Sequence, residues 1–98
     1  MIRHIFIATI KPNVSDSDVE KTIQNMRNLK NQVPEIKDIT VGRSLGWLGS
    51  NNTVSMIVDV ENQDDFDNFI NSEAHQKISS TAGDVFQTDN FVISQIEF

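Results

Sequence analysis

His4 and His75 are the only histidines of this 98-residue sequence and its best candidates for acid–base chemistry near neutral pH. An imidazole can take a proton from, or give one to, a substrate group beside a carbonyl. Each histidine also has a simpler interpretation as a buried side chain with its hydrogen bond satisfied. For His75 a third interpretation is a solvated residue behind a frayed helix. The choice depends on the elements that position both side chains.

Other chemistry is less well supported. The chain has no cysteine, which excludes disulfides, thiolate catalysis and cysteine-ligated metal centres. Two histidines without a carboxylate at ligand spacing make a poor zinc site. The acidic run "DDFD" at 64–67 is more typical of the first turn of a helix than of a calcium loop. We therefore expect neither a metal nor a cofactor.

Composition limits the partners. The hydrophobic fraction of 38% and the charged fraction of 22% are typical of a globular protein, and 98 residues suit one domain spanning 1–98. A net charge of −6 disfavours nucleic acids and anionic lipid surfaces, and no apolar stretch is long enough to cross a membrane. The pattern of the N-terminal residues predicts a strand rather than a leader peptide. These features predict a cytoplasmic protein without nucleic-acid or membrane partners.

Periodicity predicts the elements of the first half. Residues 2–11 carry apolar side chains at both parities, which indicates a strand buried on both faces. Ser15 is suited to cap a helix whose apolar stripe runs to Val33, where Pro34 ends it. A second strand is predicted over 36–45.

Periodicity also predicts the strands and the helix of the second half. Residues 53–61 alternate as a strand, and Phe66, Phe69 and Ile70 share one face of a short helix. The segment around His75 continues that helix after a break, to about Ser79 or Ser80, and 90–98 form a last strand. The order β-α-β-β-α-β predicts an α+β, ferredoxin-like fold with a four-stranded antiparallel sheet.

The second face of that sheet predicts self-association. Helices cover only one face, yet Ile5 and Ile7 point to the other, as do apolar residues of the last strand. Monomers rarely expose so large an apolar patch, so we expect a homodimer that packs open sheet face against open sheet face. The glycine-containing loop after the second strand carries Trp47. It could be a lid over a pocket, an anchor at an interface, or a side chain tucked against its own sheet.

Five stretches together resemble the stress-responsive dimeric α/β-barrel (Dabb) family over nearly the whole chain. They are "RHIFIATIK", "LKNQVP", "IKDITVGRSL", "SMIVDVENQDDFDNF" and "SEAH". The resemblance implies a dimeric α/β barrel. It also implies a pocket into which His4 and His75 point, as in plant cyclases of this family that close linear polyketides by aldol condensation. The pocket tyrosines of those cyclases fall here on Met26 and Phe69, a third histidine falls on Met56, and a proline falls on Glu73.

Strand parity, the helix stripe and the resemblance together predict one cavity between sheet and helices. Its expected lining is His4, His75, Phe6, Met26, Met56, Val58 and Phe69. Our first hypothesis is a small dimeric protein that binds an apolar ligand in this cavity. The alternative is a polyketide-cyclase-like or isomerase-like enzyme that uses His4 and His75 as acid and base. A second alternative is a cofactor-free monooxygenase of the related barrel class.

Overall fold

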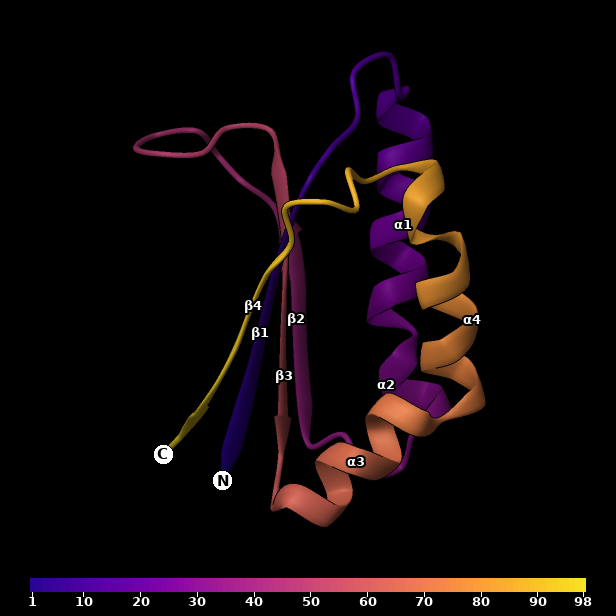
Figure 1. Ribbon diagram of the computed structural model, residues 1–98, viewed down its shortest axis with the longest axis vertical. Helices are drawn as coiled ribbons and strands as arrows, with labels where there is room; N and C mark the ends of the chain where they lie inside the picture. The colour runs from indigo at the N-terminus through magenta and orange to yellow at the C-terminus, as the bar shows by residue number, and fades with distance from the viewer.

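One face of a four-stranded antiparallel sheet carries all the helices in the computed structural model, which describes residues 1–98 (Figure 1). The elements in chain order are β1 (Ile2–Thr9), α1 (Asp16–Arg27), α2 (Leu29–Gln32), β2 (Asp38–Arg43), β3 (Thr53–Val60), α3 (Gln63–Asn71), α4 (Glu73–Thr81), the 3-10 turn η1 (Ala82–Asp84) and β4 (Val92–Glu97). The predicted α+β, ferredoxin-like order is confirmed. Each strand lies within the range that its sequence pattern predicted.

The register of the sheet fixes which side chains meet. The strand order is β2-β3-β1-β4, so β1 and β3 are central and β4 is an edge strand. His4 lies opposite Val58 on β3 and opposite Gln95 on β4, and Phe6 lies opposite Met56. Directly paired residues point to the same face of an antiparallel sheet. These side chains therefore share the inner face, under the helices.

The predicted helix from Ser15 to Val33 is wrong in one respect, because it is two helices. Ser15 caps α1 as expected, its Oγ accepting from the N–H of Asp18 at 3.1 Å. Asn28 then interrupts the helix before α2, and its side-chain Oδ1 accepts a hydrogen bond from the Asn31 side chain at 2.9 Å. Asparagine bonds locally in this way at the expense of regular helix, which explains the break.

A predicted break also separates α3 from α4, and it occurs at Ser72. Ser72 has an extended backbone, and its Oγ donates to the Phe69 carbonyl at 2.7 Å and accepts from the His75 N–H at 3.2 Å. Ser72 thus ends one helix and caps the next. This cap fixes where α4 begins and hence where His75 points.

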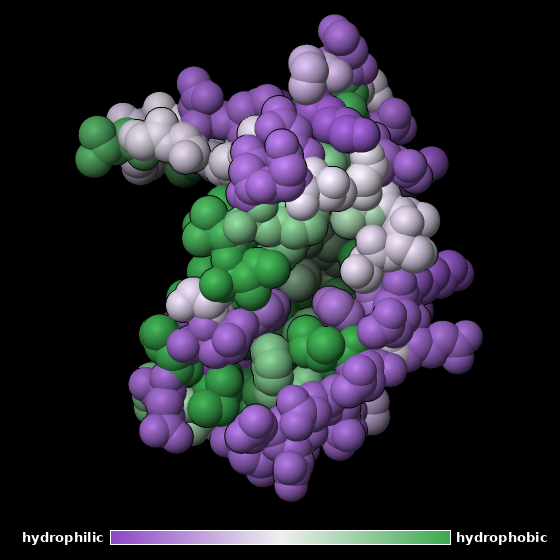
Figure 2. All heavy atoms as spheres, viewed as in Figure 1, coloured by the Kyte–Doolittle hydropathy of each residue, from purple (hydrophilic) through white to green (hydrophobic).

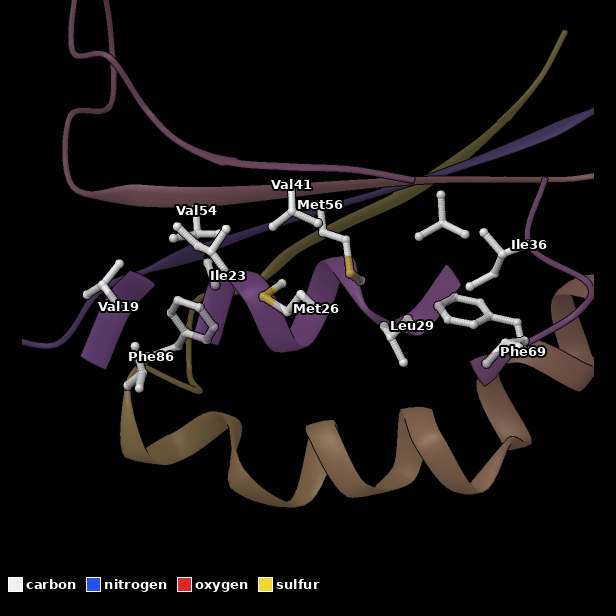
Figure 3. Close-up of a cluster of buried hydrophobic side chains, with 14 of the residues drawn as sticks. Val19, Ile23, Met26, Leu29, Ile36, Val41, Val54, Met56, Phe69 and Phe86 are labelled. Atoms are coloured by element: carbon white, nitrogen blue, oxygen red, sulfur yellow. The ribbon is translucent and has the colours of Figure 1, made fainter. Parts of the chain in front are cut away.

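The core lies between the helices and the inner face of the sheet (Figure 3). Val19, Ile23 and Met26 of α1 are buried against sheet residues that include Val54. Phe86, in the connection between α4 and β4, is buried and pairs with Ile10. The pattern there is too short to show periodicity, so only the tertiary contact reveals it.

The outer face of the sheet has no helix over it. Ile5 and Ile7 of β1 are half-buried, whereas Val92, Ile96 and Phe98 of the last segment are exposed. At one end of this face Arg3 forms a bidentate ion pair with Asp59, with N–O distances of 2.8 and 2.9 Å. The guanidinium also stacks 4.4 Å from the ring centre of Phe98. No helix of the protein is long and apolar enough to span a membrane.

The loop with Trp47 projects from the sheet on the side away from the helices (Figure 1). Trp47 is 87% exposed and Leu48 is 96% exposed. Trp47 is therefore not tucked against its own sheet, and no residue of this loop lines the main cavity, so the lid interpretation is also wrong. The interface interpretation stays a prediction.

Candidate functional site

A cavity of about 110 Å³ lies between the sheet and the helices. In the space-filling view hydrophobic side chains gather along the sheet and in the hollow beside it, while hydrophilic side chains cover the helices (Figure 2). The sheet contributes His4, Phe6 and Met56, and α1 contributes Thr22, Asn25 and Met26. Helix α4 and the segment after it contribute His75, Ile78, Ser79, Thr81, Ala82, Phe86 and Phe91.

His4 is held on the inner face of β1 and is only 4% exposed. Its Nδ1 lies 3.0 Å from Nε2 of Gln95, the residue directly opposite on β4. The amide N–H donates, so Nδ1 accepts and the neutral imidazole carries its proton on Nε2. The ring centre lies 5.3 Å from that of Phe66 and 6.0 Å from that of Phe69. These contacts hold the His4 ring in one orientation, and the facing Gln95 amide nitrogen favours the tautomer with its proton on Nε2.

His75 is held in the first turn of α4 with the opposite tautomer. Its Nδ1 lies 3.0 Å from the Ile70 carbonyl oxygen, which can only accept. Nδ1 therefore carries the proton, and Nε2 of the neutral ring is left as an acceptor. The ring meets that of Phe69 edge-on with 5.0 Å between centres. Phe69 therefore contacts both imidazoles.

Both Nε2 atoms are available to a ligand. Neither makes a hydrogen bond within the chain, and no fully buried side-chain nitrogen or oxygen lacks a partner. Each Nε2 is therefore accessible, and both residues line the cavity. A ligand in the cavity can therefore meet one N–H donor, from His4, and one basic nitrogen, from His75.

The surroundings keep both imidazoles neutral near pH 7. Burial lowers the pKa of His4, and the positive charge of His75 lowers it further. Burial also lowers the pKa of His75, although the hydrogen bond to the Ile70 carbonyl partly offsets this effect. The complementary tautomers therefore describe the site at neutral pH.

Five of the seven predicted lining residues surround the cavity: His4, His75, Phe6, Met26 and Met56. Val58 and Phe69 do not line it, contrary to the prediction. Val58 is fully buried beneath the helices, and Phe69 fills the space behind the two imidazoles. Strand parity and helix stripes identify the correct face, but they do not distinguish packed from cavity-lining positions on that face.

Sequence reasoning missed the polar part of the lining. Thr22 and Asn25 lie three residues apart on α1 beside Met26, and Ser79 and Thr81 come from the last turn of α4. The spacing of Thr22 and Asn25 with Met26 was a usable signal, because residues three and four apart share a helix face. For Gln95, the partner of His4, only the sheet register could reveal the contact. No group of three or more histidine, cysteine, aspartate or glutamate side chains comes together to hold a metal ion.

Comparison with solved structures supports the same fold. A dimeric ferredoxin-like protein of unknown function from Thermobifida fusca has a TM-score of 0.85 at 23% identity, covering 99% of this chain and 90% of that one. Hydroxynitrile lyase from Passiflora edulis has a TM-score of 0.83 at 22% identity, covering 97% and 90%. An antibiotic biosynthesis monooxygenase has a TM-score of 0.75 at 12% identity, covering 100% and 98%. At these identities the likeness concerns the fold.

No protein with a curated description matches the sequence. The family model of the stress-responsive A/B barrel domain matches residues 2–93, which include every strand start, both histidines and the whole cavity lining. The chain therefore belongs to the stress-responsive A/B barrel (Dabb) domain family.

Proposed function

We propose that this protein binds a small, largely apolar molecule that carries a neutral polar group, in the cavity between sheet and helices. The observation that carries the proposal is the pair of free Nε2 atoms, one a donor on His4 and one an acceptor on His75. Apolar walls such as Phe6, Met26 and Met56 favour a hydrophobic ligand body. The two nitrogens favour a carbonyl or hydroxyl group, which orients the ligand.

Methionine methyl NMR signals can test this binding. The chain has three methionines, of which Met26 and Met56 line the cavity and Met1 does not. Phenylacetone should shift the Met26 and Met56 signals in a saturable way and leave Met1 unchanged. Propylbenzene, which lacks the carbonyl, should bind about two- to tenfold more weakly, since a neutral hydrogen bond contributes roughly 0.5–1.5 kcal/mol.

His4→Phe supplies the matched variant, because it keeps an aromatic ring but removes the N–H donor. We expect it to abolish the preference for phenylacetone over propylbenzene. Equal shifts at all three methionines, or no saturable shift at Met26 and Met56, would contradict the binding proposal.

We also propose that the protein is a homodimer, in which the outer sheet faces of two copies pack together into a barrel. Support comes from the unpartnered apolar face formed by Ile5, Ile7, Val92 and Ile96, because apolar area removed from water contributes about 25 cal/mol per Å². Two neighbours of the same fold are described as dimeric. The outer face is remote from the cavity side, so dimerisation leaves the cavity accessible.

Proton transfer is a second candidate function, favoured by the opposite tautomers of the two histidines. His75 Nε2 would remove a proton from carbon beside a carbonyl, and His4 Nε2–H would donate a hydrogen bond to the enolate oxygen. The carbanion would then attack a second carbonyl carbon, as in a cyclase, or it would be protonated at a different atom, as in an isomerase. Removal of a hydroxyl proton from a hydroxynitrile suits the same base. A cofactor-free monooxygenase has only the shared fold in its favour.

Deuterium uptake tests proton transfer without knowledge of the natural substrate. In heavy water the wild-type protein should accelerate exchange of the benzylic protons of phenylacetone. His75→Gln removes the base and should return exchange to the buffer rate. Acceleration that persists in His75→Gln would assign the base elsewhere, and no acceleration by the wild type would leave binding as the function.

A further inference from the structure

A second, polar groove lies next to the cavity, between helices α1 and α2 on one side and α4 on the other. Its volume is about 300 Å³. It is lined by Asn25, Asn28, Gln32, Ala74, Lys77, Ile78 and Thr81. Three of these residues, Asn25, Ile78 and Thr81, also line the cavity. The groove and the cavity are therefore the outer and inner sides of one constriction between the helices.

The side chains that form the constriction are not fully buried. Two of its three members, Ile78 and Thr81, belong to α4, and α4 has no fully buried residue. Asn25 is exposed on α1. Segments with little buried apolar surface open at low free-energy cost. Rotation of these side chains would join the groove to the cavity without disturbing the core.

Lys77 is the only charged residue that lines either the groove or the cavity. The three ion pairs of the protein use Arg3, Lys37 and Arg43, so no carboxylate lies within 4.0 Å of the Lys77 ammonium. An unpaired ammonium at the mouth of an apolar cavity is suited to an anionic ligand group.

We propose that the ligand, besides the neutral polar group that faces the two histidines, carries a carboxylate or similar anionic group that stays in the groove at Lys77. Its apolar body passes between Asn25, Ile78 and Thr81 into the cavity. This assignment rests on the proposed binding function and specifies the ligand class. It makes Lys77 a specificity-determining residue and the gap between α1 and α4 the route of entry.

The test compares hexanoate with hexanamide, which are nearly equal in size and differ in charge. Both are titrated near pH 8, where the imidazoles are neutral, with the Met26 and Met56 methyl signals as readout. Hexanoate should bind the wild type about two- to fivefold more tightly than hexanamide does, because Lys77 is exposed and solvent screens the ion pair. Lys77→Gln should remove this preference by weakening the binding of hexanoate.

Lys21→Gln is the matched control, because Lys21 is an exposed lysine of α1 that lines neither the groove nor the cavity. It removes the same charge and should keep the preference for hexanoate. The proposal is overturned if both lysine variants lose the preference equally, if Lys77→Gln keeps it, or if only His4→Phe removes it. In those cases hexanamide still shifts Met26 and Met56, so the binding function stands. Failure of both probes to shift them would overturn the binding function as well.

Discussion

The two faces of the sheet contain similar apolar side chains but differ in what covers them. On the inner face Val54, Met56 and Val58 lie under the helices and are buried. On the outer face Ile5 and Ile7 are half-buried and Val92 is exposed, because the chain provides no second layer. The inner face is thus stabilised within one chain. The outer face gains comparable stabilisation only from a partner.

Polar groups differ between the faces as well. On the outer face Arg3 and Asp59 satisfy each other, and the hydrogen bonds from Arg3 lower the pKa of Asp59. On the inner face His4 and His75 each use only Nδ1 and leave Nε2 free. A satisfied pair suits a surface that becomes buried in an interface, whereas free nitrogens suit a ligand site. This difference supports the proposed dimer interface on the outer face and the proposed ligand site on the inner face.

The largest expected effect comes from a charge on the outer face. Ile7→Lys should convert the dimer to monomer or aggregate at micromolar concentration, because a lysine ammonium in an apolar interface has no partner. Light scattering measures the mass. Gln24→Lys, an added lysine on the exposed side of α1, is the control and should remain dimeric.

Trp47 provides a second readout for the same variant, since it is the single tryptophan and is exposed in the protomer. If Trp47 anchors the interface, its emission should shift to the red in Ile7→Lys. An unchanged dimer in Ile7→Lys would show that the outer face is not the interface.

Truncation of a core side chain should have a smaller effect than the loss of the interface, but its effect on the free energy of unfolding should still be large. Leu29→Ala removes a side chain of α2 that is fully buried in the core, and we expect a loss of about 2–5 kcal/mol in the free energy of unfolding. Urea denaturation at fixed protein concentration measures this loss. Gln24→Ala on exposed α1 should change the value by less than about 0.5 kcal/mol. Similar losses in the two variants would mean that α2 is not packed as described.

As the pH falls, the stability contributed by the two inner-face histidines should be lost at a higher pH than the stability contributed by the Arg3–Asp59 ion pair. The pKa values of His4 and His75 lie below 6.5 in the folded protein, so the unfolded chain binds more protons below that pH. Their contribution to stability is therefore present above pH 6.5 and is lost as the pH falls through the folded pKa values. The double variant His4→Gln, His75→Gln should show a flatter dependence between about pH 5 and 7.5. The depressed pKa of Asp59 acts only at lower pH.

The smallest expected effect is the coupling between the two imidazoles. Replacing His75 by Gln removes the positive charge that lowers the pKa of His4, so the pKa of His4 should rise. NMR titration of the His4 ring measures the change. A His4 pKa that does not respond to His75→Gln would show that the two rings do not share one site.

The sequence determined most of the fold, because hydrophobic periodicity and caps act locally. Alternation at 53–61, the cap at Ser15 and the break near Ser72 were readable from neighbouring residues. The exception within the helices was Asn28, where side-chain bonding interrupts a stripe that continues across it. The apolar outer face was also readable, since the parity of Ile5 and Ile7 in an extended strand fixes their side.

Tertiary structure alone decided how the site is composed. Gln95 reaches His4 only because β4 pairs with β1, and these two residues are 91 positions apart in the chain. The tautomer of His75 depends on the Ile70 carbonyl, which is free to accept because the helix breaks at Ser72. Whether Val58 is packed and Phe6 lines a cavity depends on how the helices sit over the sheet. Periodicity reports which face a side chain occupies, whereas cavities and hydrogen-bond partners arise from contacts between distant segments.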